Sequence, residues 1–171
     1  MTEKIKYAII GAGCMGQEHI LNIGIIDDAE VVALCDTSEK SIQESLELLN
    51  DEVAIFHDYN DLIDANIADA FIIATPNFTH IDVLKDVMKS EVHLLIEKPL
   101  CTTVKDCQEF EKLAENYPGV IWTAMEYRYM PPVQRMINEI HNNTIGDLKM
   151  LSIREHRFPF LHKVDDWNRF A

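Results

Sequence analysis

Three glycines near the start of the chain limit the folds open to it more than any other feature. They lie in the segment GAGCMG at residues 11–16, directly after an apolar, β-branched run at residues 4–10. Residues from 13 to about 23 then have helix-forming composition. A glycine turn in this position joins a buried strand to a helix packed against it. The first part of the sequence therefore predicts one strand–helix unit of a parallel sheet.

Strand-like and helix-like segments continue to alternate up to about residue 124. Further strands are predicted at residues 30–36, 53–56, 70–74, 92–96 and 120–124, and further helices at residues 37–50, at 79–90 and from residue 103 onward. Thr79 with Asp82, and Thr103 with Asp106, have the spacing of helix-capping pairs. Such alternation implies parallel pairing with right-handed crossovers. The predicted fold class is α/β, a Rossmann-type doubly wound parallel sheet that forms one domain over residues 1–124.

The composition changes after residue 124. Residues 1–124 contain 8 Lys and no Arg against 23 acidic residues, whereas residues 125–171 contain 7 basic and 6 acidic residues. Prolines 131 and 132 predict a helix start, Gly146 a helix end, and residues 148–158 a long strand. One helix and one strand are too few for a domain, so residues 125–171 are predicted to begin an incomplete α+β domain. Its unpaired strand edge would favour a homo-oligomer.

The overall charge excludes one class of partner. The net charge of −14 and the pI near 4.8 would repel nucleic acid. No apolar run approaches the roughly 20 residues of a membrane span, and no signal peptide is evident, so a cytoplasmic location is expected. The four cysteines (Cys14, Cys35, Cys101 and Cys107) lack CxxC or zinc-ligand spacing, and no metal site is expected.

The glycine segment fits the pattern GxGxxG, and Asp36 ends the second predicted strand twenty residues after Gly16. This is the context of a dinucleotide site. Gly11 would form the tight turn, Gly13 would let a diphosphate approach, and Gly16 would let the helix pack on its strand. Asp36 would bind ribose hydroxyls and repel a 2′-phosphate, so NAD is the expected cofactor, and nearby Lys40 keeps NADP open. The alternative interpretation is a glycine turn with a solvated surface acid.

Two further signatures follow predicted strands: ATPNFTH at residues 74–80 and EKPL at residues 97–100. Together with the glycine segment they resemble the Gfo/Idh/MocA family, over essentially the whole chain. Members of that family are two-domain oxidoreductases that act on sugars, cyclitols and related hydroxyl compounds. The ordered set of three motifs at strand ends is more specific than any one of them.

The resemblance implies roles for particular residues. Those expected at the cofactor are Gly11, Gly13, Cys14, Met15, Gly16, Asp36, Thr75, Pro76, Asn77, His80, Glu97 and Lys98. Within this set, residues 75–80 would line the nicotinamide half of the cleft, and Glu97 and Lys98 would reach its ribose. Lys98 would also be catalytic, by orienting the substrate hydroxyl and stabilising alkoxide charge. Without the family, His80 would be an exposed residue of a first helical turn and Lys98 a surface cation paired with Glu97.

The resemblance also implies that much of the family's second domain lies outside these 171 residues. Family members carry an Asp and a His on one helix after a glycine-rich stretch, whereas no glycine follows Gly146. Residues 154–171 resemble the segment just before that helix. The acids and histidines at positions 156, 162, 165 and 166 are therefore interpreted as solvated or structural. Tyr127, Arg128 and Trp167 match positions near substrate, with packing and surface charge as alternatives.

The leading functional hypothesis is an NAD(P)-dependent oxidoreductase. It would transfer a hydride between the nicotinamide cofactor and a hydroxyl of a sugar, cyclitol or related polyol, with weak or no activity in this portion alone. The alternative is a non-catalytic dinucleotide-binding or interaction module from a truncated gene. A P-loop protein is disfavoured because the sequence contains no GxxxxGK[ST].

Overall fold

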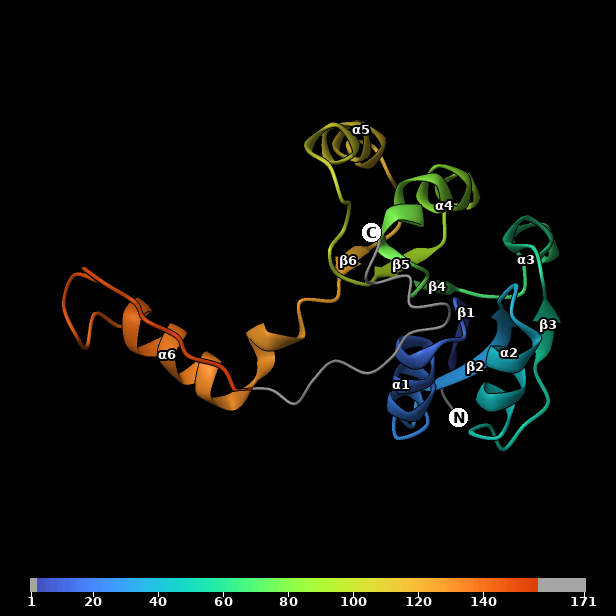
Figure 1. The fold of residues 1–171 in the computed structure, drawn as a ribbon, viewed down its shortest axis with the longest axis horizontal. Helices are drawn as coiled ribbons and strands as arrows, with labels where there is room; N and C mark the ends of the chain where they lie inside the picture. Colours follow the sequence, from blue (N-terminus) through green and yellow to red (C-terminus); the bar gives the residue numbers. More distant parts are fainter. Residues whose placement is uncertain (1–2, 157–171) are drawn as a thin grey trace. The chain divides into compact units, whose positions relative to one another are not determined.

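The computed structural model describes residues 3–156, which divide into two compact units between Ala124 and Met125. The first unit contains a six-stranded parallel sheet in the order β3-β2-β1-β4-β5-β6 (Figure 1). Its strands are β1 (Ile5–Ile10), β2 (Ala29–Cys35), β3 (Ala54–Phe56), β4 (Ala70–Ile73), β5 (His93–Ile96) and β6 (Ile121–Thr123). The predicted doubly wound α/β fold is confirmed. Strand order reverses between β1 and β4, which is where ligands bind in such sheets.

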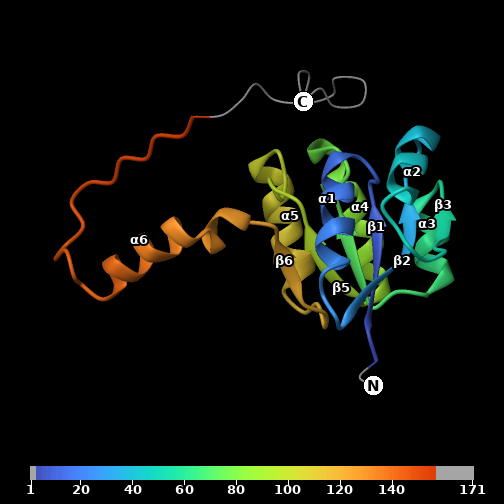
Figure 2. The same cartoon turned by 90° about the horizontal axis from the view of Figure 1, so that it is seen from below.

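Helices cover both faces of this sheet (Figures 1 and 2). They are α1 (Cys14–Ile23), α2 (Glu39–Leu46), α3 (Tyr59–Ala65), α4 (His80–Val87) and α5 (Val104–Ala114), with 3₁₀ turns η1 (Asn77–Thr79) and η2 (Met88–Ser90) around α4. Helices α1 and α2 pack on the face that carries Ile9 and Ile72. Helices α3, α4 and α5 pack on the opposite face, which carries Ala8 and Phe71. Two apolar cores therefore support the strand ends from both sides.

Helix α3 was not predicted from the sequence. Asp58 caps it by accepting a hydrogen bond from the N–H of Asn60, and Leu62 is its one fully buried side chain. A helix of 7 residues with a single buried position gives little periodic signal. The Asp58 cap before Tyr59 and Leu62 was the signal available.

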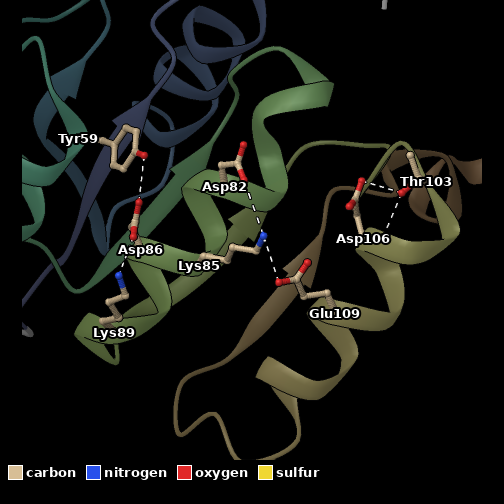
Figure 3. A network of polar contacts seen from close by, with 8 residues as sticks. All are labelled: Tyr59, Asp82, Lys85, Asp86, Lys89, Thr103, Asp106 and Glu109. Atoms are coloured by element: carbon tan, nitrogen blue, oxygen red, sulfur yellow. Dashed lines mark hydrogen bonds and ion pairs between the residues drawn. The ribbon is translucent and has the colours of Figure 1, made fainter.

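One of the two predicted capping pairs is confirmed and one is wrong. The Thr103 hydroxyl accepts from the N–H of Asp106 at 3.1 Å and donates to its carboxylate at 2.7 Å (Figure 3). The Thr79 hydroxyl instead donates to the Pro76 carbonyl at 2.7 Å. The 3₁₀ turn before α4 gives the first N–H groups backbone acceptors, so a side-chain cap is not needed.

Polar side chains connect α4 to its neighbours on the second face, as Figure 3 shows. From α3, the Tyr59 hydroxyl donates to Asp86 at 3.1 Å. Toward α5, Lys85 lies 3.1 Å from Glu109. These contacts join α4 to both flanking helices. The first turn of α4 belongs to the candidate site.

The second unit contains η3 (Glu126–Tyr129) and α6 (Pro131–His141), which begins at the predicted proline. The predicted strand at residues 148–158 is wrong over residues 148–156, where no strand forms; residues 157 and 158 lie outside the described part. A strand needs a neighbour for its backbone groups, and residues 125–156 provide none. Between residues 3 and 156 no helix is long and apolar enough to cross a bilayer.

Candidate functional site

The glycine turn after β1 lies against the loop that follows β4. Gly11 has a φ of +100°, and a Cβ there would lie 2.6 Å from the carbonyl carbon of Ala74. A Cβ on Gly16 would lie 2.1 Å from the Gly11 carbonyl oxygen. Only glycine fits these two positions, because real Cβ contacts are never so short. The turn is thus built by backbone packing between neighbouring strand ends.

Gly13 has a different environment, because a Cβ added there would meet no atom of residues 3–156 within 4 Å, apart from its chain neighbours and its own helix backbone. Gly13 is also the N-cap residue of α1 and offers no side chain to that helix terminus. The first N–H groups of a helix have no intrahelical acceptor, and they favour an anion. The open space beside Gly13 therefore fits the diphosphate of a dinucleotide.

Two side chains, one directly after β2 and one on α2, hold this turn in place. The Asp36 carboxylate accepts from the N–H of Ala12 and from the N–H of Ser38, each at 2.8 Å. The fully buried hydroxyl of Ser45 donates to the Ala12 carbonyl at 2.8 Å. Both backbone groups of Ala12 are thereby fixed. The Asp36 carboxylate retains lone pairs that could accept from ribose hydroxyls. The role of Ser45 was not predicted from the sequence, where its only signal was a small residue on a predicted helix.

Ser45→Ala is expected to lower the free energy of unfolding by about 1–3 kcal/mol, because it leaves the buried Ala12 carbonyl without its close donor. The amide of Gln17, at 3.4 Å, is a poor replacement. Chemical denaturation measures the loss. Ser41→Ala is the control. Ser41 is also buried on α2, but its hydrogen bond to the Ser38 hydroxyl comes from the backbone N–H, which alanine keeps. Equal stabilities of the two variants would contradict the assignment.

The loop after β4 brings the backbone of Ala74 and Thr75 against Gly11, and Pro76 and Asn77 follow in the same loop. The Asn77 side-chain oxygen is buried and, among residues 3–156, has no hydrogen-bond partner. Buried polar atoms without partners are rare in folded proteins and call for an explanation. An amide donor on a bound ligand, such as a carboxamide, would satisfy this oxygen.

His80 is buried, with 1% of its surface exposed, so the alternative interpretation of an exposed helix residue is wrong. Its Nε2 lies 3.1 Å from the Thr75 carbonyl and its Nδ1 lies 3.0 Å from the Pro99 carbonyl. The ring therefore bridges the loops that follow β4 and β5. A direct contact of His80 with a cofactor stays a prediction.

The loop after β5 contains Glu97, which is buried, and Lys98, which is exposed and precedes a cis peptide bond to Pro99. Glu97 accepts from the Nε2 of His19 at 2.9 Å and from the N–H of Lys98 at 3.2 Å. Burial raises the pKa of Glu97, but the hydrogen bond and charge of His19, helped by Lys98, hold the net pKa below its ordinary value. Glu97 is thus a charged acid at neutral pH. His19, three residues after Gly16, was missed in the sequence.

The other residues predicted from the sequence lie on α1, in the second unit or outside the described residues. Cys14 and Met15, the first residues of α1, are half-buried. In the second unit Tyr127 is exposed and its hydroxyl donates to Glu155 at 2.7 Å, and Arg128 is exposed. Trp167 lies outside the described residues, as do positions 162, 165 and 166. Within residues 3–156 no three His, Cys, Asp or Glu side chains form a group suited to a metal ion.

Comparison with known proteins identifies the family. Residues 5–125 match the Gfo/Idh/MocA family, described as an oxidoreductase family with an NAD-binding Rossmann fold. The chain belongs to this family, which confirms the resemblance noted from the three motifs.

Three relatives illustrate the match. Inositol 2-dehydrogenase from Pseudarthrobacter chlorophenolicus is 31% identical, over 93% of this chain and 47% of its own length. Rhizopine catabolism protein MocA from Rhizobium meliloti is 26% identical, over 87% of this chain and 46% of its own. The WlbA dehydrogenase from Bordetella pertussis, solved with NADH and UDP-GlcNAcA, superposes with a TM-score of 0.77 at 25% identity, over 84% of this chain and 44% of that one. The chain thus spans about half the length of these relatives.

Proposed function

We propose that this chain supplies the cofactor-binding part of an NAD(P)-dependent oxidoreductase. The reaction would move a hydride between the nicotinamide and a hydroxyl of a sugar, cyclitol or related polyol. One observation carries the proposal. Strands β1, β4 and β5 are neighbours in a parallel sheet, so the three motifs that follow them lie at the same edge of the sheet. That edge is where open α/β sheets bind ligands. The relatives include an inositol 2-dehydrogenase and a glucose-6-phosphate 3-dehydrogenase, which support the substrate class.

The residues take distinct roles in the binding step. The N-terminus of α1, beside Gly13, would hold the diphosphate, and Asp36 would accept the hydroxyls of the adenosine ribose. Asn77 would accept from the carboxamide, which gives its buried oxygen a partner. The charge of Asp36 would repel a 2′-phosphate, whereas the exposed Lys40, 3.6 Å from Glu44, leaves NADP open. NAD is therefore favoured over NADP.

In this proposal few residues of the chain take part in the chemical step. A bound nicotinamide supplies the hydride-accepting ring. Lys98 would donate a hydrogen bond to the substrate hydroxyl and stabilise the negative charge that develops on its oxygen. Glu97 would fix the adjacent loop at the nicotinamide ribose. The proton-transfer Asp and His of the family have no counterparts assigned in residues 3–156, so the chain alone is proposed to turn over weakly or not at all.

Calorimetric titration of the 171-residue chain with NAD, NADH and NADP tests the binding step. Saturable binding of NAD or NADH, tighter than binding of NADP, is expected. NADH formation from myo-inositol or glucose 6-phosphate, followed by absorbance, tests the chemical step and is expected to be weak or absent. Clear turnover would contradict the weak activity. Absence of binding by folded protein would contradict the proposal and leave an interaction module as the alternative.

A further inference from the structure

A largely buried hydrogen bond connects two residues that are far apart in the sequence. The Nε2 of His19, on α1, lies 2.9 Å from Oε1 of Glu97, at the end of β5. Only 16% of the His19 side chain and 8% of the Glu97 side chain is exposed. The positions are 78 residues apart, and in the sheet β4 separates β5 from β1, the strand that leads into α1. The pair therefore crosses the topological switch point.

The contacts of Glu97 define its orientation. Oε1 accepts from His19 and Oε2 accepts from the N–H of Lys98 at 3.2 Å. A glutamate has several rotatable bonds, and one backbone contact to the next residue leaves most of them undetermined. The imidazole of His19 is the second point that holds the carboxylate. Charge also matters here, because a buried carboxylate without a partner would be strongly disfavoured.

His19 itself is held by helix α1, whose N-terminal turn is the candidate diphosphate site. Gly16, one turn earlier, packs directly on the glycine turn, and Ile20, the next residue, is buried in the core against the sheet. Helix α1 thus fixes the backbone of His19, and the N–H of Glu97 donates to the Ile73 carbonyl at 2.9 Å, which fixes the backbone of Glu97. With both backbones held, the hydrogen bond from His19 helps to set the direction of the Glu97 carboxylate.

We propose that His19 is a positioning residue for cofactor binding, which fixes the Glu97 carboxylate at the carboxyl end of β5 so that it can bind the nicotinamide ribose. The inference rests on the proposed function. It gives His19 no contact with the cofactor, so its effect on affinity passes through Glu97. The lowered pKa of Glu97 agrees with this role, because it keeps the carboxylate charged at neutral pH.

A double-mutant cycle on NADH affinity tests the proposal, with wild type, His19→Leu, Glu97→Leu and the double variant measured by calorimetry. His19→Leu is expected to weaken NADH binding about tenfold, the effect of losing one hydrogen bond to a charged group. In the Glu97→Leu background, which has no acceptor for His19, the same substitution is expected to have no further effect. His19→Gln, whose side-chain amide can place a donor near the position of Nε2, is expected to restore most of the wild-type affinity.

Each outcome decides a separate question. Wild-type protein that folds and fails to bind NADH contradicts the proposed function. The positioning role is wrong if wild type and His19→Leu bind NADH equally well. It is also wrong if His19→Leu weakens NADH binding by the same factor with and without Glu97. A purely structural role would lower the melting temperature without rescue of affinity by His19→Gln. Should His19→Leu not fold, His19→Asn takes its place, since its shorter side chain cannot reach Glu97. His141→Leu, in exposed α6, is the control.

Discussion

Gly13→Ala is expected to leave the first unit folded and to weaken NAD binding by about a hundredfold or more, because a single misplaced methyl group would displace the diphosphate from the helix terminus. Among residues 3–156, apart from its chain neighbours and the backbone of its own helix, the added Cβ meets no atom within 4 Å, and Gly13 does not have a positive φ, so the described fold has no reason to change. The space beside the Cβ is proposed to hold the ligand. Calorimetric titration with NADH measures the affinity, and thermal unfolding measures the stability.

Gly16→Ala and Gly24→Ala are the matched controls for Gly13→Ala. A Cβ at Gly16 would lie 2.1 Å from the Gly11 carbonyl oxygen, so this variant should lose about 3 kcal/mol or more of stability. At Gly24 the nearest atoms are 3.5 Å away, and neither stability nor affinity should change greatly. Loss of stability in Gly13→Ala, or unchanged NADH affinity in that variant, would contradict the assignment of the open space to the diphosphate.

Asp36→Ala is expected to weaken NADH binding by about a hundredfold, since hydrogen bonds from ribose hydroxyls to a charged acceptor would be lost. The variant also removes the acceptor of the N–H groups of Ala12 and Ser38, so the glycine turn loses one of its side-chain supports. NADPH should be affected much less than NADH, because the charge that repels its 2′-phosphate is gone. Parallel titrations with NADH and NADPH measure both effects.

Asp58→Ala is the control that separates the loss of NADH affinity in Asp36→Ala from a general loss of stability. Asp58 also follows a strand, β3, and its carboxylate caps α3, so its removal should destabilise the fold by about 1 kcal/mol. It should leave NADH affinity unchanged. If Asp36→Ala and Asp58→Ala have the same affinity for NADH, Asp36 has only a structural role and the ribose assignment is wrong.

The fold class could be predicted because its signals are local. Each strand is a short apolar run, each long helix has a regular spacing of apolar residues, and the glycine turn specifies how the first strand meets the first helix. Where the local signal was weak, prediction failed. Helix α3 has one fully buried residue and was missed, and residues 148–156 have apolar content without a partner strand and form no strand.

The sequence by itself determined the glycine turn, the acid after β2 and the order of three motifs at strand ends, because each depends on residues close together in the chain. Only the tertiary structure decided which side chains support them. Ser45 reaches Ala12, His80 reaches Pro99 and His19 reaches Glu97 across 33, 19 and 78 residues. These contacts follow from the strand order β2-β1-β4-β5, which is set by the packing of the whole sheet and cannot be inferred from spacing along one chain.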